Sequence, residues 1–151
     1  MSIGVNTYVV FLHRWFFGGF LCIIDNMERN ELIRLINDNT RIIWDNLCEL
    51  YPRLLKYNPP VIILNNRLWR NAGLSHQESN IIELGYKFFI HSTDYYYEMI
   101  NIILPHEIIH QADYNLFGLS EAKCGHGKKW REIMINYGLE DNKYHSMEIK
   151  R

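Results

Sequence analysis

The sequence predicts a single α+β domain in which helices pack on a small β-sheet. Apolar residues recur at helical spacing near both ends of the chain, and short β-branched runs lie between these helical segments. The length of 151 residues, with 48% apolar and 22% charged side chains, fits one domain with a buried core. The same composition excludes extended disorder.

The first predicted helix begins near Glu28, which forms a capping-box pattern with Asp25. Tyr51-Pro52 is expected to end this helix, because a proline disfavours helical backbone in the residue before it. Between these points the apolar residues recur near helical spacing, at Leu32, Leu35, Ile36, Ile43, Leu47 and Leu50. The segment therefore reads as one long amphipathic helix.

The middle of the chain has the composition of a small sheet. Pro59-Pro60 precedes Val61–Leu64, a β-branched run that predicts a strand. Asn71-Ala72-Gly73 is typical of a turn. Residues 79–90 predict one or two further strands, because apolar side chains alternate at Tyr86, Phe88 and Ile90.

Helical periodicity returns over Tyr96–Leu116, where apolar residues repeat by seven at Ile102, Ile109 and Leu116. Pro105 lies inside this stretch and either begins the helix or kinks it, because proline has no amide proton to donate. A last helix is predicted over Gly127–Tyr137, and Gly138 suits the position just after its end.

The first 26 residues include the most apolar stretch of the chain, Thr7–Ile24. His13 and Arg14 divide it into runs shorter than the roughly 20 residues that a bilayer requires, so membrane association is the least favoured reading. Two others stay open: an additional element packed on the domain, or an upstream extension with Met27 as the working start. Residues 1–26 are accordingly set apart from a domain over 27–151.

The strongest chemical signal is His106-Glu107-Ile108-Ile109-His110, an H-E-x-x-H pattern inside a predicted helix. Histidines four residues apart are offset by about 40° around a helix, so both imidazoles can reach one ion. Glu107 projects about 100° away from His106 and can approach a water on that ion without binding it. Zinc lowers the pKa of such a water to about 7, which lets a nearby carboxylate take its proton.

A catalytic zinc needs a third protein ligand. A third histidine on the continuation of the same motif is absent, because Asp113 and Leu116 occupy the relevant positions. His126 is preferred because Gly125 and Gly127 flank it, and glycines let the backbone approach an ion. The alternative ligands are Glu121, Glu132 and Cys124.

Four motifs follow one another along the chain, namely N-R-L-W-R-N-A-G-L at Asn66–Leu74, L-P-H-E-I-I-H at Leu104–His110, G-H-G-K-K-W at Gly125–Trp130 and K-Y-H-S-M at Lys143–Met147. In this order and spacing they resemble the SprT-like zinc metallopeptidases, which include bacterial SprT and the DNA–protein crosslink protease Spartan. The resemblance covers residues 27–148, nearly the whole chain after the apolar segment.

The resemblance implies a zincin-like domain with an antiparallel sheet of about three strands beside the metal-binding helices. It implies one zinc ion held by His106, His110 and His126, with Glu107 as general base. Tyr144 and His145 match a Y-H near the end of the family domain, where packing or support of the site is favoured over contact with the scissile carbonyl. Arg67 and Arg70 are expected to serve mainly as scaffold and cleft wall.

Charge and cysteine content narrow the remaining expectations. The net charge of −1 argues against a strongly basic nucleic-acid coat. Three cysteines without a C-x-x-C pair exclude the zinc ribbon that usually follows in bacterial SprT, and favour a reducing, intracellular compartment. Four basic residues lie around His126, namely Lys123, Lys128, Lys129 and Arg131. They predict either a local patch that binds a DNA backbone or a solvated helix face.

The leading prediction is a zinc-dependent endopeptidase that acts on a protein substrate, with DNA-associated proteins suggested by the resemblance. The alternative is a zinc-bearing module that binds DNA or chromosomal proteins with weak or no turnover. Retention of Glu107 speaks against the alternative, because a purely structural zinc site needs no base.

Overall fold

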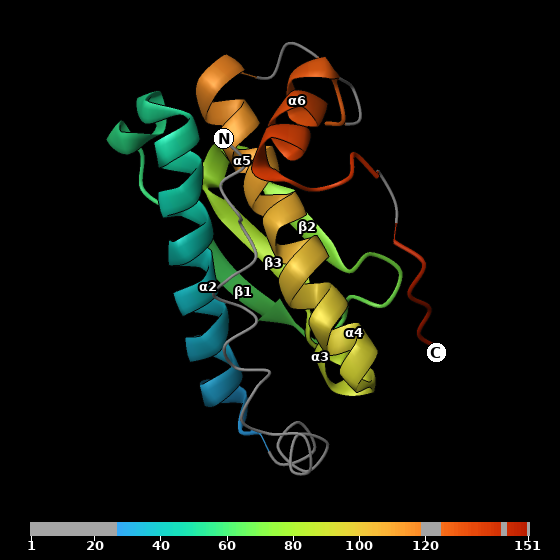
Figure 1. Cartoon of the computed structure of the whole chain (residues 1–151). Helices are drawn as coiled ribbons and strands as arrows, with labels where there is room; N and C mark the ends of the chain where they lie inside the picture. Colours follow the sequence, from blue (N-terminus) through green and yellow to red (C-terminus); the bar gives the residue numbers. More distant parts are fainter. Residues whose placement is uncertain (1–26, 119–124, 143–144, 151) are drawn as a thin grey trace.

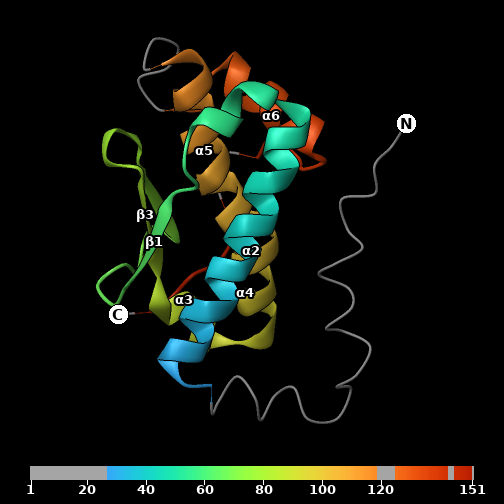
Figure 2. The same cartoon turned by 90° about the vertical axis from the view of Figure 1, so that its left-hand side faces the viewer.

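The computed structural model describes residues 27–118, 125–142 and 145–150. Several features predicted from the sequence lie outside the described residues: the segment 1–26, the alternative ligands Glu121 and Cys124, and the candidates Lys123 and Tyr144. The described part is an α+β domain in which one small sheet packs against a layer of helices (Figures 1 and 2).

Helix α2, Arg29–Leu50, confirms the long amphipathic helix at the start of the domain. It buries one stripe of side chains that includes Leu32, Ile36, Ile43 and Leu47. The predicted capping box was wrong, because Glu28 is itself the N-cap residue and makes no side-chain cap hydrogen bond. The helix ends at Leu50 as expected, and Pro52–Lys56 then form a short 3₁₀ turn.

The sheet holds three strands, β1 (Val61–Asn65), β2 (Gly73–His76) and β3 (Ile81–Gly85), in the spatial order β1-β3-β2. Strand β3 pairs antiparallel with β2 and parallel with β1. The chain reverses twice between β1 and β3, so these neighbouring strands run in the same direction. The sheet is therefore mixed, and the expectation of an antiparallel sheet was wrong.

Two local predictions between residues 71 and 91 were also wrong. Gly73, assigned to a turn, is the first residue of β2. Residues 79–90 were predicted to form one or two strands: Ile81–Gly85 is the strand β3, but the alternating segment after it forms helix α3, Tyr86–His91. Phe88 and Phe89 are both buried there, a spacing that a strand cannot give to one face. Three alternating residues were too few to separate the two periods.

Helix α4 (Thr93–Glu98), a π-helical turn (Met99–Ile103) and helix α5 (Leu104–Phe117) together replace the single helix predicted over Tyr96–Leu116. The amide of Leu104 donates to the carbonyl of Met99 five residues earlier, directly before Pro105. A wide turn at this point accommodates a residue that has no amide proton and whose ring crowds the preceding turn.

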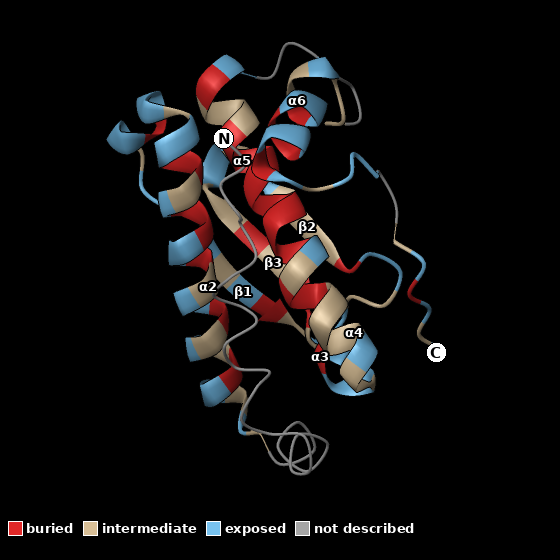
Figure 3. Ribbon diagram, in the orientation of Figure 1, coloured by how far each residue is buried: buried red, intermediate tan, exposed pale blue. Residues whose placement is uncertain are grey.

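Helix α6, Lys128–Tyr137, confirms the last predicted helix, with Gly127 as N-cap and Gly138 in the left-handed conformation just after the end. Helix α5 lies between β2 and β3 on one side and α2 and α6 on the other, so most of its residues are buried (Figure 3). No helix within the described ranges is long and apolar enough to cross a membrane.

Candidate metal centre

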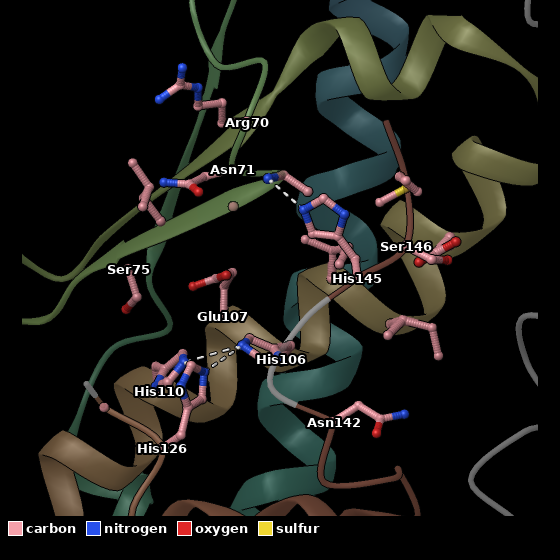
Figure 4. A pocket seen from close by; sticks show the side chains of 18 of the residues that line it. Arg70, Asn71, Ser75, His106, Glu107, His110, His126, Asn142, His145 and Ser146 are labelled. Carbon is pink, nitrogen blue, oxygen red and sulfur yellow. Dashed lines mark hydrogen bonds between the residues drawn. The ribbon is translucent and has the colours of Figure 1, made fainter. Parts of the chain in front are cut away.

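The site is built on the first turns of α5 and on the loop before α6 (Figure 4). His106, Glu107 and His110 are each no more than 8% exposed, although all three are polar. His126 comes from the loop directly before the N-cap of α6 and is half-buried. The third histidine thus reaches α5 because α6 packs against it.

The three histidines point their Nε2 atoms at a common centre. The Nε2–Nε2 distances are 3.2 Å for His106–His110, 3.1 Å for His110–His126 and 3.2 Å for His126–His106. Nitrogen ligands about 2.0–2.1 Å from a tetrahedral zinc lie roughly 3.3–3.4 Å from one another. The triangle is close to that spacing, so these residues fit a metal ion with three histidine ligands.

Burial keeps the two helical imidazoles neutral. It lowers the pKa of His106 to about 4, with His126 and His145 acting in the same direction. It lowers the pKa of His110 to about 3, together with the charges of His106 and His126. A neutral imidazole offers the lone pair that a metal requires, so the site favours ligation over protonation at neutral pH.

Glu107 lies outside the histidine triangle, in the space between α5 and β2 (Figure 4). Burial raises the pKa of its carboxyl group to about 8. A carboxyl group in such an environment binds a proton more readily than one in water, which suits a group that takes up and releases a proton.

Trp130 packs against all three rings of the triangle, a role that was not predicted from the sequence. Its indole, fully buried on α6, stacks on His110 at 5.2 Å and meets His106 and His126 edge to face at 4.8 and 4.5 Å. The signal in the sequence was its place four residues after His126 on the predicted helix.

Gly125 brings the backbone close to one histidine of the triangle. Its φ angle is +72°, a value that residues with a side chain rarely adopt. A Cβ atom there would lie 3.2 Å from Cε1 of His110. The backbone before His126 therefore packs directly on the ring of a neighbouring histidine.

The triangle and Glu107 open into a cleft of about 1070 Å³ between β2, α5 and residues 145–148. His145 lines this cleft: its Nε2 accepts a hydrogen bond of 3.3 Å from the Ala72 amide, and its ring meets Phe88 edge to face. The Tyr95 hydroxyl accepts from the Glu148 amide and donates to the Glu148 carbonyl. The contacts of His145 and Glu148 therefore attach residues 145–148 to the domain.

The other candidates occupy separate places. Arg70 lines the cleft with its guanidinium over the ring of Trp69, whereas Arg67 is exposed on the turn after β1. Glu132, an alternative ligand, is on α6 and forms an ion pair of 3.7 Å with Lys129. It is not one of the residues that form the triangle.

Three residues of the predicted basic patch are among the described residues, and two of them are exposed. Lys128 and Arg131 are exposed on α6. Lys129 is half-buried, pairs with Glu132 and lies over the ring of Phe117.

The fold and the site together define an α+β domain in which two histidines of an H-E-x-x-H helix and one from a loop can hold a metal ion. The model of the SprT-like family matches residues 47–148, and the chain belongs to this family. The protein named SprT from Actinobacillus succinogenes (strain ATCC 55618 / DSM 22257 / CCUG 43843 / 130Z) is 30% identical over 80 residues. Those residues make up 52% of this chain and 44% of that protein, so the match spans less than half of the relative. No solved structure matches the chain.

Proposed function

We propose that this protein is a zinc-dependent endopeptidase. The observation that carries the proposal is the carboxylate of Glu107 in the same cleft as three converging histidines. A site that only held a metal for structural reasons would need no carboxyl group beside its ligands. Membership of the SprT-like family supports the same activity.

The three histidines would hold the zinc ion through their Nε2 atoms. When bound, zinc acts as a Lewis acid and lowers the pKa of a coordinated water to about 7. Glu107 would act as general base, taking a proton at its carboxylate and delivering it to the leaving amine. Its burial limits the contact of the carboxyl group with bulk water during that exchange.

The edge of β2 offers a place for the substrate backbone. Strand β2 is at the edge of the sheet, and among the described strands only β3 pairs with it. Ala72, Gly73, Leu74 and Ser75 line the cleft along that strand. An extended peptide can add to such an edge through main-chain hydrogen bonds, which would bring one peptide bond past Glu107.

Glu107→Gln tests the proposal, because glutamine keeps the shape of the side chain but cannot accept and release a proton. Zinc content should stay that of the wild type, while cleavage of an unfolded protein such as casein should fall by at least about 100-fold. Glu49→Gln, at an exposed position in α2, is the matched control and should cleave normally. Undiminished cleavage by Glu107→Gln would refute the mechanism.

The alternative of a zinc-bearing binding module makes a different prediction for the same proteins. Wild type and Glu107→Gln would then bind zinc equally and both would fail to cleave. We further propose that the substrates are proteins bound to DNA, supported by the exposed Lys128 and Arg131 beside His126. Binding of single-stranded DNA by the wild type and by a variant without these two side chains tests this extension.

A further inference from the structure

Gly73, the first residue of β2, lies directly against the side chain of Glu107. A Cβ atom on Gly73 would be 2.6 Å from Cγ of Glu107, 2.8 Å from Oε1 and 3.0 Å from Cδ. Atoms that are not bonded do not approach so closely, so the Glu107 side chain fills the space that any other residue would need at position 73.

The requirement for glycine at this position concerns space and not backbone conformation. The described glycines with positive φ are Gly118, Gly125 and Gly138, and Gly73 is not among them. Alanine at position 73 would thus adopt the same backbone without strain, and the three atoms nearest to its Cβ would all belong to Glu107.

Strand β2 cannot easily move away from Glu107, because other contacts hold it in place. Gly73 pairs with Leu84 of β3. The buried Ala72 before it accepts a hydrogen bond of 2.8 Å from the amide of Gly85 and donates one to His145. A shift of β2 would break contacts on both sides of the sheet edge.

Glu107 is equally restricted on its own side. It lies in the first turn of α5, between His106 and the fully buried Ile108. A rotation of α5 that relieved a clash at Glu107 would also displace His106 and His110. The Glu107 side chain therefore lies between a helix and a strand that each have further contacts to keep.

We propose that Gly73 is a positioning residue for Glu107: by having no side chain, it lets β2 form one wall of the space that holds the carboxylate beside the histidines. The catalytic consequence rests on the proposed peptidase function. The packing relation between the two residues does not, and it can be measured in a protein of any activity.

A double-mutant cycle on thermal stability tests the packing relation. Gly73→Ala should lower the Tm by about 3–10 °C, a range typical of an overpacked core position in a domain of this size. In a Glu107→Ala background the same substitution should change the Tm little, because the side chain that it meets is gone. Equal losses in both backgrounds would overturn the proposal.

Kinetics on the zinc-loaded enzyme test the positioning role. Gly73→Ala should retain zinc and KM for a peptide substrate, while kcat falls by about 10–100-fold through displacement of the carboxylate. Gly138→Ala is the matched control: its φ of +97° makes alanine unfavourable, so stability should fall while kcat stays unchanged. An unchanged kcat in an active Gly73→Ala enzyme would overturn the positioning role.

The two measurements separate this inference from the proposed function. If the wild type cleaves no protein or peptide, the peptidase proposal fails. Independent Tm losses in the cycle would overturn the inference, and coupled losses would support it, whatever the activity.

Discussion

Trp130 shows how one apolar residue can organise a polar site. Three imidazole rings that converge through their nitrogens repel one another when charged, and in the absence of packing each would rotate about its side-chain bonds. The buried indole contacts all three rings and so restricts them before any ion arrives. Preorganised ligands lose less conformational entropy on binding, which favours metal affinity.

Trp130→Ala should therefore weaken both folding and metal binding. The lost packing should lower the free energy of unfolding by about 3–5 kcal/mol, and zinc affinity should fall by about 10–100-fold. Urea denaturation of the metal-free protein and competition with a zinc chelator measure the two effects separately.

Two variants of α6 make the result interpretable. Ile135→Ala, at a position 61% exposed, should leave both quantities nearly unchanged. Trp130→Phe should recover part of the zinc affinity, because an aromatic ring again packs against the histidines. Wild-type zinc affinity in a folded Trp130→Ala protein would show that the indole does not organise the ligands.

At the scale of elements, the π-helical turn Met99–Ile103 sets which face of the preceding segment meets the core. The sequence pattern placed Ile102, Ile109 and Leu116 on one buried face. Ile109 and Leu116 are buried, but Ile102 is 42% exposed and Ile103 is only 5% exposed. An i→i+5 turn takes in one more residue than an α-helical turn, so the buried face moves on by one position.

This one-residue shift of the buried face predicts that two adjacent isoleucines contribute unequally to stability. Ile103→Ala should lower the free energy of unfolding by about 2–5 kcal/mol, whereas Ile102→Ala should change it by no more than about 0.5 kcal/mol. Each variant differs from the wild type by the same atoms, so each is the control for the other. Equal losses of unfolding free energy in urea denaturation, or a larger loss for Ile102→Ala, would contradict the shift of the buried face.

Elements with strong local signals were predictable, and those that depend on neighbours were not. α2 and α6 have repeated apolar faces and clear ends, and Val61–Leu64 follows a proline pair. β2 is four residues long with no buried side chain, so its sequence has no strand pattern, and its pairing with β3 defines it. The parallel pairing of β1 with β3 is a property of the sheet that no local pattern contains.

For the molecule as a whole, the candidate site also has a part that local sequence patterns predict and a part that depends on contacts between distant segments. His106, Glu107 and His110 follow from helical spacing, and His126 from its glycines, so the three histidines that come together could be named from the sequence. The contact of Gly73 with Glu107 and the bond from Ala72 to His145 join segments more than 30 residues apart. Such contacts arise only when sheet, helix and C-terminal segment come together, and single-sequence spacing does not reveal them.

The net charge of the molecule limits how strongly it can attract DNA. With a net charge of −1, long-range attraction to a polyanion is weak, and any affinity must come from a local surface. Lys128 and Arg131 line a shallow groove next to the cleft, and His126 borders both hollows. Carboxylates of Glu132 and Asp141 also line this groove, which limits its attraction for phosphate.

Replacing both Lys128 and Arg131 by alanine should weaken binding to single-stranded DNA and reduce its salt dependence. Two lost phosphate contacts should make the slope of log K against log salt concentration shallower by about 1.4, because each contact on a single strand contributes about 0.7. Fluorescence anisotropy of a labelled oligonucleotide over a range of salt concentrations measures that slope. The control pair, Arg34→Ala with Lys87→Ala, removes the same charge from exposed positions on α2 and α3. Equal changes in both double variants would mean that the protein responds only to net charge, and the α6 surface would then not be a DNA site.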